Sequence, residues 1–201
     1  MKIVLAGAGT AGHIEPALAV ADAWRKEFPQ SEFEFVGTTT GLENILVTGA
    51  GYKLTTIPKV TLPRSLKPTG LLAPLKFGQA LAKSLQIVNG AECVIGFGGY
   101  VSAPIYLAAA MRRIPFVIHE ANAIPGWANR FGAFLGGAMA VGKSVKTGKF
   151  RSAEVVGLPL KPAISTALDL AKSDWPAARS SAKAKLGIKD GKPLILIMGG
   201  S

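Results

Sequence analysis

A glycine-rich turn followed by a histidine, near the start of the chain, has the residue types and spacing that most directly indicate chemistry. The turn Gly7–Gly12 follows an aliphatic run, Met1–Ala6, which predicts a buried strand, and a helical pattern begins at Ile14. A strand, a glycine turn and a helix start direct backbone N–H groups at one point and favour an anion there, typically a phosphate. The helix dipole also favours a neutral imidazole at His13, the state from which a general base must start.

The letters of this turn match the dinucleotide pattern GxGxxG, which is a weak signal by itself. A NAD site also needs an acidic residue at the end of the second strand, where it binds a ribose hydroxyl. The second predicted strand, Phe33–Val36, is followed by glycine and three threonines, and Glu34 lies inside it. A nucleotide-dependent oxidoreductase is therefore the less favoured interpretation. A packing turn without a ligand is a further alternative.

Polar residues also follow two later predicted strands, Glu92–Phe97 and Pro115–Ile118. Ligands of open α/β sheets bind at the carboxyl ends of strands, so these loops and the glycine turn predict one site. The histidine and glutamate in the second loop fit either a substrate contact or a structural hydrogen bond. The loop residues are Gly98, Gly99, Tyr100 and Ser102 after the first strand, and His119, Glu120 and Asn122 after the second.

Strands alternate with helices, which predicts an α/β, Rossmann-like parallel sheet with helices on both faces. One such domain extends to about Leu160. A weakly patterned linker then runs to about Ser173, and a capped helix, Asp174–Leu186, and an apolar strand, Pro193–Met198, predict the start of a second domain. The other predicted strands are Lys53–Ile57, Ala138–Val141 and Glu154–Val156, and the other predicted helices are Leu42–Thr48, Leu71–Val88, Trp127–Leu135 and one from about Ala103.

Charge is distributed unevenly along the chain. The 201 residues carry a net charge of +11, with 49% hydrophobic and 17% charged residues, which supports a folded core. No acidic residue occurs between Glu43 and Glu92 or between Glu120 and Glu154, so one basic face is expected. That face predicts an anionic partner, and we favour a membrane surface because no nucleic-acid-binding module is recognisable. The apolar residues and surrounding cations of the predicted contact are Arg64, Lys67, Leu71, Leu72, Leu75 and Lys76. The alternative for these residues is a helix end packed on its neighbour.

Cysteine usage and the amino-terminal residues bear on the cellular compartment. Cys93 is the only cysteine, so neither a disulfide nor a thiolate metal site is expected, as suits a reducing cytosol. Met1 leads directly into a strand, so we expect no signal peptide. The uncharged run Cys93–Met111 is broken by glycines and a proline and is not expected to span a membrane.

Four motifs together make the chain resemble the MurG family, glycosyltransferases of peptidoglycan synthesis, over essentially its whole length. Alanines at positions 8, 11 and 121 stand where the family commonly has Gly, Gly and Gln, and no charged group is lost. The motifs are Gly9-Thr10-Ala11-Gly12-His13 with Pro16, then Gly96–Ser102, His119–Asn122, and Glu154–Gly157 with Pro159, followed at a distance by Gly199-Gly200-Ser201.

The resemblance implies an inverting hexosyltransferase of the GT-B fold, which has two Rossmann-like domains with the active site between them. Residues 1–160 would then be the acceptor- and membrane-binding domain, and residues 161–201 the linker and the start of the UDP-sugar-binding domain. Such an enzyme transfers N-acetylglucosamine from UDP-GlcNAc to lipid I, the undecaprenyl-diphosphate-linked muramyl-pentapeptide, and gives lipid II. It acts as a peripheral protein at the cytoplasmic face of the bacterial cell membrane. Residues 1–201 alone are not expected to transfer sugar, because most of the donor contacts lie outside them.

Roles for individual residues are expected partly from their own positions, as for His13 and the acceptor loops, and partly from the resemblance, as for the contacts to UDP-GlcNAc. His13 is the expected general base, and the alternative is that it caps the turn or binds phosphate. Lys161 stands in place of a family arginine, so it keeps the charge but loses the two-pronged hydrogen bonding. The contacts to UDP-GlcNAc would come from Thr10, Ala11, Gly12, Asn122, Lys161 and Ser201, and those to the acceptor diphosphate from Gly98, Gly99, Tyr100 and Ser102, with His119 and Glu120.

Neither a metal nor a cofactor is expected, because the chain has no Asp-x-Asp pair to hold a metal on the diphosphate. A stand-alone module that binds lipid-linked diphosphates remains an alternative to the transferase.

Overall fold

The computed structural model describes residues 1–59, 73–188, 193–195 and 197. The chain divides into two compact units, Met1–Pro159 and Leu160–Ser201. The first unit contains a parallel β-sheet with helices on both faces, and the described residues of the second contain two helices.

The seven strands in the described part of the chain form one parallel sheet in the order β3-β2-β1-β4-β5-β6-β7. The direction of winding reverses between β1 and β4. In sheets of this kind the reversal is where ligands bind, beyond the carboxyl ends of the strands. The strands are β1 (Lys2–Gly7), β2 (Glu32–Gly37), β3 (Lys53–Thr56), β4 (Cys93–Gly98), β5 (Phe116–Glu120), β6 (Ala138–Val141) and β7 (Glu154–Val155).

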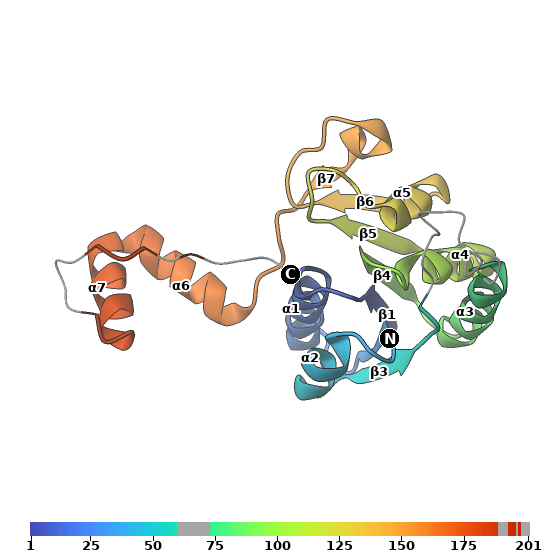
Figure 1. Ribbon diagram of the computed structural model, residues 1–201, viewed down its shortest axis with the longest axis horizontal. Coiled ribbons are helices and arrows are strands. Elements are labelled where there is room, and N and C mark those ends of the chain that lie inside the picture. The colour runs from blue at the N-terminus through green and yellow to red at the C-terminus, as the bar shows by residue number, and fades with distance from the viewer. Residues whose placement is uncertain (60–72, 189–192, 196, 198–201) are drawn as a thin grey trace. The chain divides into compact units, whose positions relative to one another are not determined.

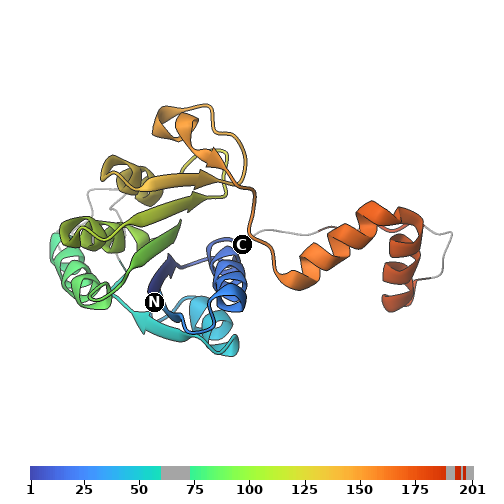
Figure 2. The same ribbon diagram turned by 180° about the vertical axis from the view of Figure 1, so that it is seen from behind.

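Helices cover both faces of this sheet (Figures 1 and 2). On one face lie α1 (Ala11–Glu27) and α2 (Glu43–Gly49), and on the other lie α3 (Ala73–Ile87), α4 (Ser102–Arg112) and α5 (Trp127–Phe134). A short 3-10 helix, η2 (Gly148–Ser152), precedes β7. The arrangement confirms the predicted Rossmann-like class.

The strand β1 supplies side chains to two apolar cores, one on each face of the sheet. Ile3 and Leu5 belong to the core that includes Leu18 of α1, whereas Val4 belongs to the core that includes Ile105 of α4. All three β1 side chains are buried. Alternate side chains point to opposite faces of a sheet, and a strand covered on both faces is therefore apolar throughout. This is why the first strand reads as a continuous aliphatic run.

Two element boundaries near the candidate site differ from the sequence prediction. Helix α1 begins at Ala11 rather than Ile14, so Gly12 and His13 belong to its first turn. Pro16 consequently lies in the second turn, where its missing N–H leaves the Gly12 carbonyl without the usual helical donor. Strand β5 runs to Glu120, and the polar pair at its end is part of the strand rather than of the following loop.

In the second unit, the prediction of a linker up to about Ser173 is wrong. Residues Pro162–Ser173 form a helix, α6, with a proline in its first turn, and α7 (Trp175–Lys185) follows directly. The Asp174 carboxylate caps α7 by accepting a hydrogen bond of 3.0 Å from the Ala177 N–H.

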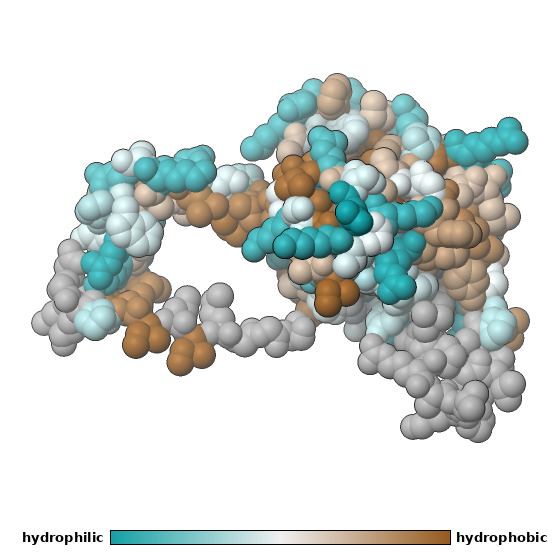
Figure 3. All heavy atoms as spheres, turned by 90° about the horizontal axis from the view of Figure 1, so that it is seen from above, coloured by the Kyte–Doolittle hydropathy of each residue, from teal (hydrophilic) through white to brown (hydrophobic). Residues whose placement is uncertain are grey.

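The predicted strand Pro193–Met198 is not a strand at its described residues, 193–195 and 197, and the other two lie outside the description. Apolar side chains of this unit lie exposed, as the brown surfaces in Figure 3 illustrate; Ile195 and Ile197 are 82% and 90% exposed.

Candidate active site

A cavity of about 520 Å³ opens at the carboxyl ends of β1, β4 and β5, next to the reversal in strand order. Three segments that are distant in sequence form its wall: the glycine turn after β1, the glycine turn after β4, and the loop from β5 into α5. The lining residues are Ala8, Gly9, Thr10, His13, Lys59, Gly98, Gly99, Tyr100, Glu120, Asn122, Gly126, Trp127, Ala128 and Asn129. The structure therefore brings together the loops that the sequence predicted to form one site.

The two glycine turns touch each other through their backbones. Gly98 and Gly99 have φ angles of +100° and +85°, a conformation that other residues rarely adopt. A Cβ on Gly99 would collide with the carbonyl oxygen of Ala8. A Cβ on Gly98 would lie 3.1 Å from His13 Nε2. Glycine is thus required at these positions both for the turn and for the close approach of the first loop.

The hydrogen bonds of His13 define which ring nitrogen is available for chemistry. Its Nδ1 atom lies 3.1 Å from the Ala8 carbonyl oxygen and 3.3 Å from Thr10 Oγ1. A carbonyl oxygen only accepts hydrogen bonds, so Nδ1 must carry the hydrogen. In the neutral ring the lone pair is then on Nε2, on the side of Gly98 and the cavity. This is the arrangement that a general base requires.

Glu120 organises the loop between β5 and α5. Its Oε1 accepts hydrogen bonds from the backbone N–H and the side-chain amide of Asn122, at 2.8 and 2.9 Å. Its Oε2 accepts from the Gly126 N–H at 2.9 Å and from the Asn129 amide at 3.0 Å. With both oxygens occupied in this way, the geometry suits an ionised carboxylate that shapes the wall, and it fixes the orientation of the Asn122 amide.

Asn129 continues this network into the core. Its Oδ1 accepts a hydrogen bond of 2.9 Å from the hydroxyl of Tyr106, which is fully buried. Burial raises the pKa of that hydroxyl well above its usual range, so Tyr106 remains a donor. Gly96 in β4 leaves room for the Tyr106 ring, because a Cβ there would collide with it. Asn129 was not predicted as a site residue, since nothing in the sequence distinguishes it from a polar residue on a helix surface.

Two predicted acceptor residues lie away from the cavity wall. Ser102 is fully buried and donates to the carbonyl oxygens of Gly98 and Ala6, at 2.8 and 3.2 Å. His119 is 5% exposed, and its Nε2 lies 3.0 Å from the Gly157 carbonyl oxygen. These contacts give both residues a structural part, in that Ser102 ties the second glycine turn to β1 and His119 ties β5 to the segment after β7.

Lys59 and Trp127 also line the cavity, and neither was predicted as a site residue. The Lys59 ammonium lies 4.9 Å from the centroid of the Tyr100 ring. A cation therefore lines the cavity together with the two glycine turns. Trp127 begins α5 and supplies an apolar wall. In the sequence Lys59 was one lysine among several, and only the fold brings it to the site.

Of the remaining predicted residues, some lie in or next to helices of the structure, and the others lie outside the residues that the structure describes. Ala11 and Gly12 lie in the first turn of α1, and Lys161 immediately precedes α6 in the second unit. Leu75, which is 61% exposed, and Lys76 lie on the first turn of α3. Predicted residues outside the described part of the chain are Arg64, Lys67, Leu71, Leu72 and Ser201.

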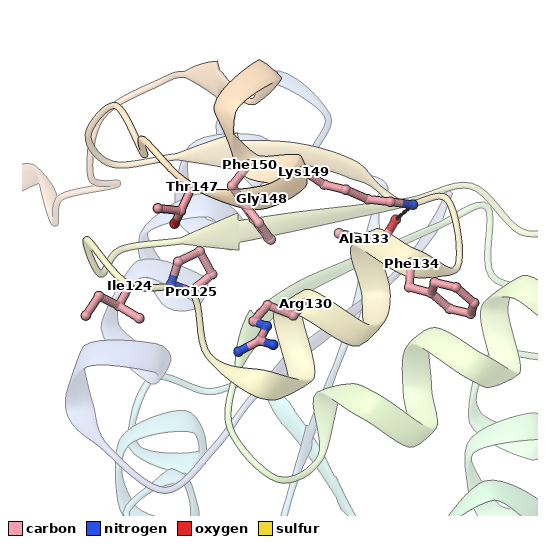
Figure 4. A pocket seen from close by; sticks show the side chains of 9 residues that line it. All are labelled: Ile124, Pro125, Arg130, Ala133, Phe134, Thr147, Gly148, Lys149 and Phe150. Carbon is pink, nitrogen blue, oxygen red and sulfur yellow. Dashed lines mark hydrogen bonds between the residues drawn. The ribbon is translucent and has the colours of Figure 1, made fainter.

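A second cavity, of about 480 Å³, lies between the loop that follows β5, the helix α5 and η2 (Figure 4). Ile124 and Pro125 line it from the loop, and Phe150 extends toward α5. Lys149 donates a hydrogen bond of 3.3 Å to the Ala133 carbonyl oxygen. Among the residues that the structure describes, this cavity shares no lining residue with the first one and includes none of the predicted site residues.

Within residues 1–59, 73–188, 193–195 and 197, no group of three or more His, Cys, Asp or Glu side chains is placed to hold a metal ion. The helices in this part of the chain also fall short of the length and apolar character needed to cross a membrane.

Comparisons with known proteins agree with the fold. Residues 3–140 match the model of the glycosyltransferase family 28 N-terminal domain. The chain is 46% identical to the UDP-N-acetylglucosamine--N-acetylmuramyl-(pentapeptide) pyrophosphoryl-undecaprenol N-acetylglucosamine transferase of Frankia casuarinae, and 46% identical to the protein of that name from Thermobifida fusca. Both alignments cover 100% of this chain and 52% of the relative. The chain therefore spans about half the length of the curated relatives it matches.

Among solved structures, the crystal structure of Acinetobacter baumannii MurG resembles this chain with a TM-score of 0.65 and 28% identity, over 78% of this chain and 44% of that one. The fold and the cavity define a Rossmann-like domain of the kind that forms the N-terminal half of GT-B glycosyltransferases. Within that class, the chain belongs to glycosyltransferase family 28. The resemblance seen in the sequence motifs is thereby confirmed, and the oxidoreductase alternative is set aside.

Proposed function

We propose that this chain forms the acceptor-binding half of an inverting hexosyltransferase. The complete enzyme would transfer N-acetylglucosamine from UDP-GlcNAc to the undecaprenyl-diphosphate-linked muramyl-pentapeptide, lipid I, and release lipid II. The family match and the printed names of the relatives support this reaction. The observation that carries the proposal is the cavity in which His13 lies beside two glycine turns at the reversal in strand order.

The geometry suits the deprotonation half of such a reaction. An acceptor hydroxyl gives its proton to His13 Nε2 while its oxygen forms a bond to the anomeric carbon of the donor sugar. The bond from that carbon to the UDP oxygen breaks, and its electron pair leaves with the diphosphate. Attack from the face opposite the leaving group inverts the anomeric configuration. His13 returns the proton to solvent after product release.

The acceptor diphosphate is proposed to lie along the glycine turns of the cavity. The N–H groups at the start of α1 and the Lys59 ammonium offer the positive ends of dipoles and a full charge to such a group. In the same proposal Tyr100, Gly98 and Gly99 contact the acceptor, whereas Thr10, Ala11, Gly12 and Asn122 contact UDP-GlcNAc. Lys161 and Ser201 add to these donor contacts, and the remaining ones would come from sequence outside residues 1–201. Residues 1–160 thereby form the acceptor and membrane domain, and residues 161–201 begin the donor domain.

Membrane association belongs to the proposal because the acceptor carries a polyprenyl chain. Leu75 and Lys76, at the start of α3, are exposed and combine an apolar side chain with a cation. A peripheral contact with an anionic bilayer at the cytoplasmic face needs this combination. Arg64, Lys67, Leu71 and Leu72 are proposed to extend the same contact.

Binding of a soluble lipid I analogue to the 201-residue chain tests the proposal. Because Trp127 lines the cavity, its fluorescence should change on titration with the analogue. Replacing Trp127 by Phe should abolish that change. Trp24 on α1 and Trp175 on α7, which do not line the cavity, supply the unchanged background. NADH at the same concentration serves as the matched negative ligand. If NADH binds and the acceptor analogue does not, the proposed function is wrong.

A further inference from the structure

A buried carboxylate outside the cavity, that of Glu43, is linked to the glycine turn. Glu43 is the first residue of α2 and is fully buried. Its Oε1 accepts hydrogen bonds from the N–H and the hydroxyl of Thr38, at 2.7 and 2.8 Å. Its Oε2 accepts a hydrogen bond of 3.2 Å from the N–H of Gly9, 34 residues earlier in the chain.

The local sequence makes room for this carboxylate. A Cβ on Gly37 or on Gly41 would collide with the Glu43 side chain, so the two glycines form the space that it occupies. Burial by itself opposes ionisation of the group. Hydrogen bonds from the N–H groups of Thr38, of Glu43 itself and of Gly9, and from the Thr38 hydroxyl, outweigh that effect and hold the pKa of Glu43 below its ordinary value. Glu43 is therefore a negative charge directed at the glycine turn.

One peptide group connects this charge to His13. The Gly9 N–H that Glu43 binds and the Ala8 carbonyl that His13 Nδ1 binds belong to the same planar amide. A hydrogen bond to a carboxylate polarises an amide and makes its carbonyl oxygen a stronger acceptor. The three groups, carboxylate, peptide and imidazole, thus form one continuous chain of hydrogen bonds.

We propose that Glu43 is a positioning residue for His13 and acts through the Ala8–Gly9 peptide group. This chain of hydrogen bonds from Glu43 through the Ala8–Gly9 peptide group to His13, called the relay below, keeps the hydrogen of the neutral ring on Nδ1. The lone pair of Nε2 is then directed at the cavity. When Nε2 takes the acceptor proton, the Nδ1–H remains on the Ala8 carbonyl, and Glu43 stays ionised throughout. The role of His13 as base rests on the proposed function, whereas the arrangement of hydrogen bonds does not.

Nitrogen NMR of the 201-residue chain at roughly pH 8.5, where an ordinary histidine is neutral, reads the tautomers directly. The chain has two histidines, and they should differ. His13 should carry its hydrogen on Nδ1, because Ala8 accepts there, and His119 on Nε2, because Gly157 accepts there. If His13 carries its hydrogen on Nε2 in the unmodified chain, the relay does not exist, and this result needs no variant.

The variant Glu43→Gln removes the charge but keeps the shape. The amide oxygen should stay with Thr38, which offers two short hydrogen bonds, so the amide NH₂ faces the Gly9 N–H, donor against donor. We expect His13 to shift from the Nδ1–H form toward a mixture of both tautomers, while His119 is unchanged. An unchanged His13 tautomer would overturn the proposal.

The matched control is Glu34→Gln. Glu34 is also a buried carboxylate, held by Lys2 and Lys53 at 3.1 Å each and by the Thr55 hydroxyl at 2.7 Å, without a link to the glycine turn. If Glu34→Gln shifts the His13 tautomer as much as Glu43→Gln does, the shift reflects a general loss of stability. The relay is then rejected.

Kinetics of the complete enzyme provide the second arm. Glu43→Gln should lower kcat about five- to tenfold with little change in the acceptor KM, the loss expected when one orienting hydrogen bond is weakened. Glu34→Gln should leave kcat within about twofold. If the unmodified enzyme transfers no sugar, the proposed function fails while the NMR result still decides on the relay. If it transfers sugar and Glu43→Gln changes only KM, the relay fails alone.

Discussion

His13 shows how one backbone contact decides which atom of a side chain can react. The Ala8 carbonyl oxygen lies 3.1 Å from Nδ1 and so leaves Nε2 as the only basic nitrogen of the neutral ring. His119 has the opposite arrangement, since its Nε2 is used by Gly157. The two histidines of the chain therefore differ in which ring nitrogen lies beside a backbone carbonyl group, a difference that their residue type alone does not reveal.

Replacement of His13 by alanine in the complete enzyme should lower kcat by roughly 10²–10⁴-fold, with the acceptor KM little changed, because a positioned base contributes about that factor. Steady-state kinetics with a lipid I analogue measure both constants. His13→Gln is the informative companion, since an amide forms hydrogen bonds but does not take up the proton. Recovery of kcat in the glutamine variant, or a loss confined to KM, would make His13 a binding residue instead.

At the scale of elements, the contact between the two glycine turns holds the site together. Gly99→Ala would place a side chain at a φ of +85° and against the Ala8 carbonyl. The left-handed conformation and the collision together should lower the free energy of unfolding by about 2–5 kcal/mol. Chemical denaturation of the 201-residue chain measures this loss.

Gly90 is the matched control for that substitution. Its φ is +71°, yet nothing lies within 4 Å of a Cβ built there. Gly90→Ala should therefore cost only about 1–2 kcal/mol, the price of the backbone conformation alone. Equal losses in the two variants would show that the turns do not press on each other.

The start of α3 should determine binding to anionic vesicles. Lys76→Ser should weaken binding about fivefold, equivalent to about 1 kcal/mol for one cation near such a surface, and added salt should reduce the difference. Lys26→Ser, on α1 and the other face of the sheet, is the matched control. Vesicle sedimentation in which both variants bind like the unmodified chain would contradict a contact at α3.

The elements with strong apolar patterning were predictable from the sequence, and those that depend on pairing at a distance were not. The strand Ala138–Val141 has the predicted bounds. Helix α6 was missed although Ile164, Leu168 and Ala171 recur at helical spacing, and none of its residues is buried in the structure. His119 and Glu120 were placed after β5 because polar residues usually end a strand, but here hydrogen bonds to distant groups allow them to be buried in it.

In the candidate site, too, the local motifs were predictable from the sequence, whereas the contacts between residues distant in sequence were not. The glycine turns and His13 are local motifs, so their spacing indicated a site directly. Glu43 was not predicted, because its partner Gly9 is 34 residues away and only the pairing of β1 with β2 brings the two together. The glycines at positions 37 and 41 were the available signal, and they resemble an ordinary loop.

At the scale of the whole molecule, the described part of the chain contains a seven-stranded parallel sheet in the first unit and two helices in the second. A transferase of the GT-B fold binds its two substrates between two domains, so residues 1–201 by themselves should bind the acceptor analogue without transferring sugar to it. Incubation with UDP-GlcNAc and the analogue, followed by mass spectrometry of the product, checks this. Any turnover by residues 1–201 would contradict the assignment of the donor contacts to sequence outside them.

The floor of the cavity is built from main chain where the two glycine turns meet, and this has a consequence for inhibitors. A compound that binds the backbone N–H and C=O groups of these turns contacts atoms that every residue type except proline possesses. Substitution at Gly98 or Gly99 to expel it would strain the turn and push against the first loop. Resistance by point substitution should therefore arise at the side-chain walls, such as Trp127 and Tyr100, and rarely at the floor.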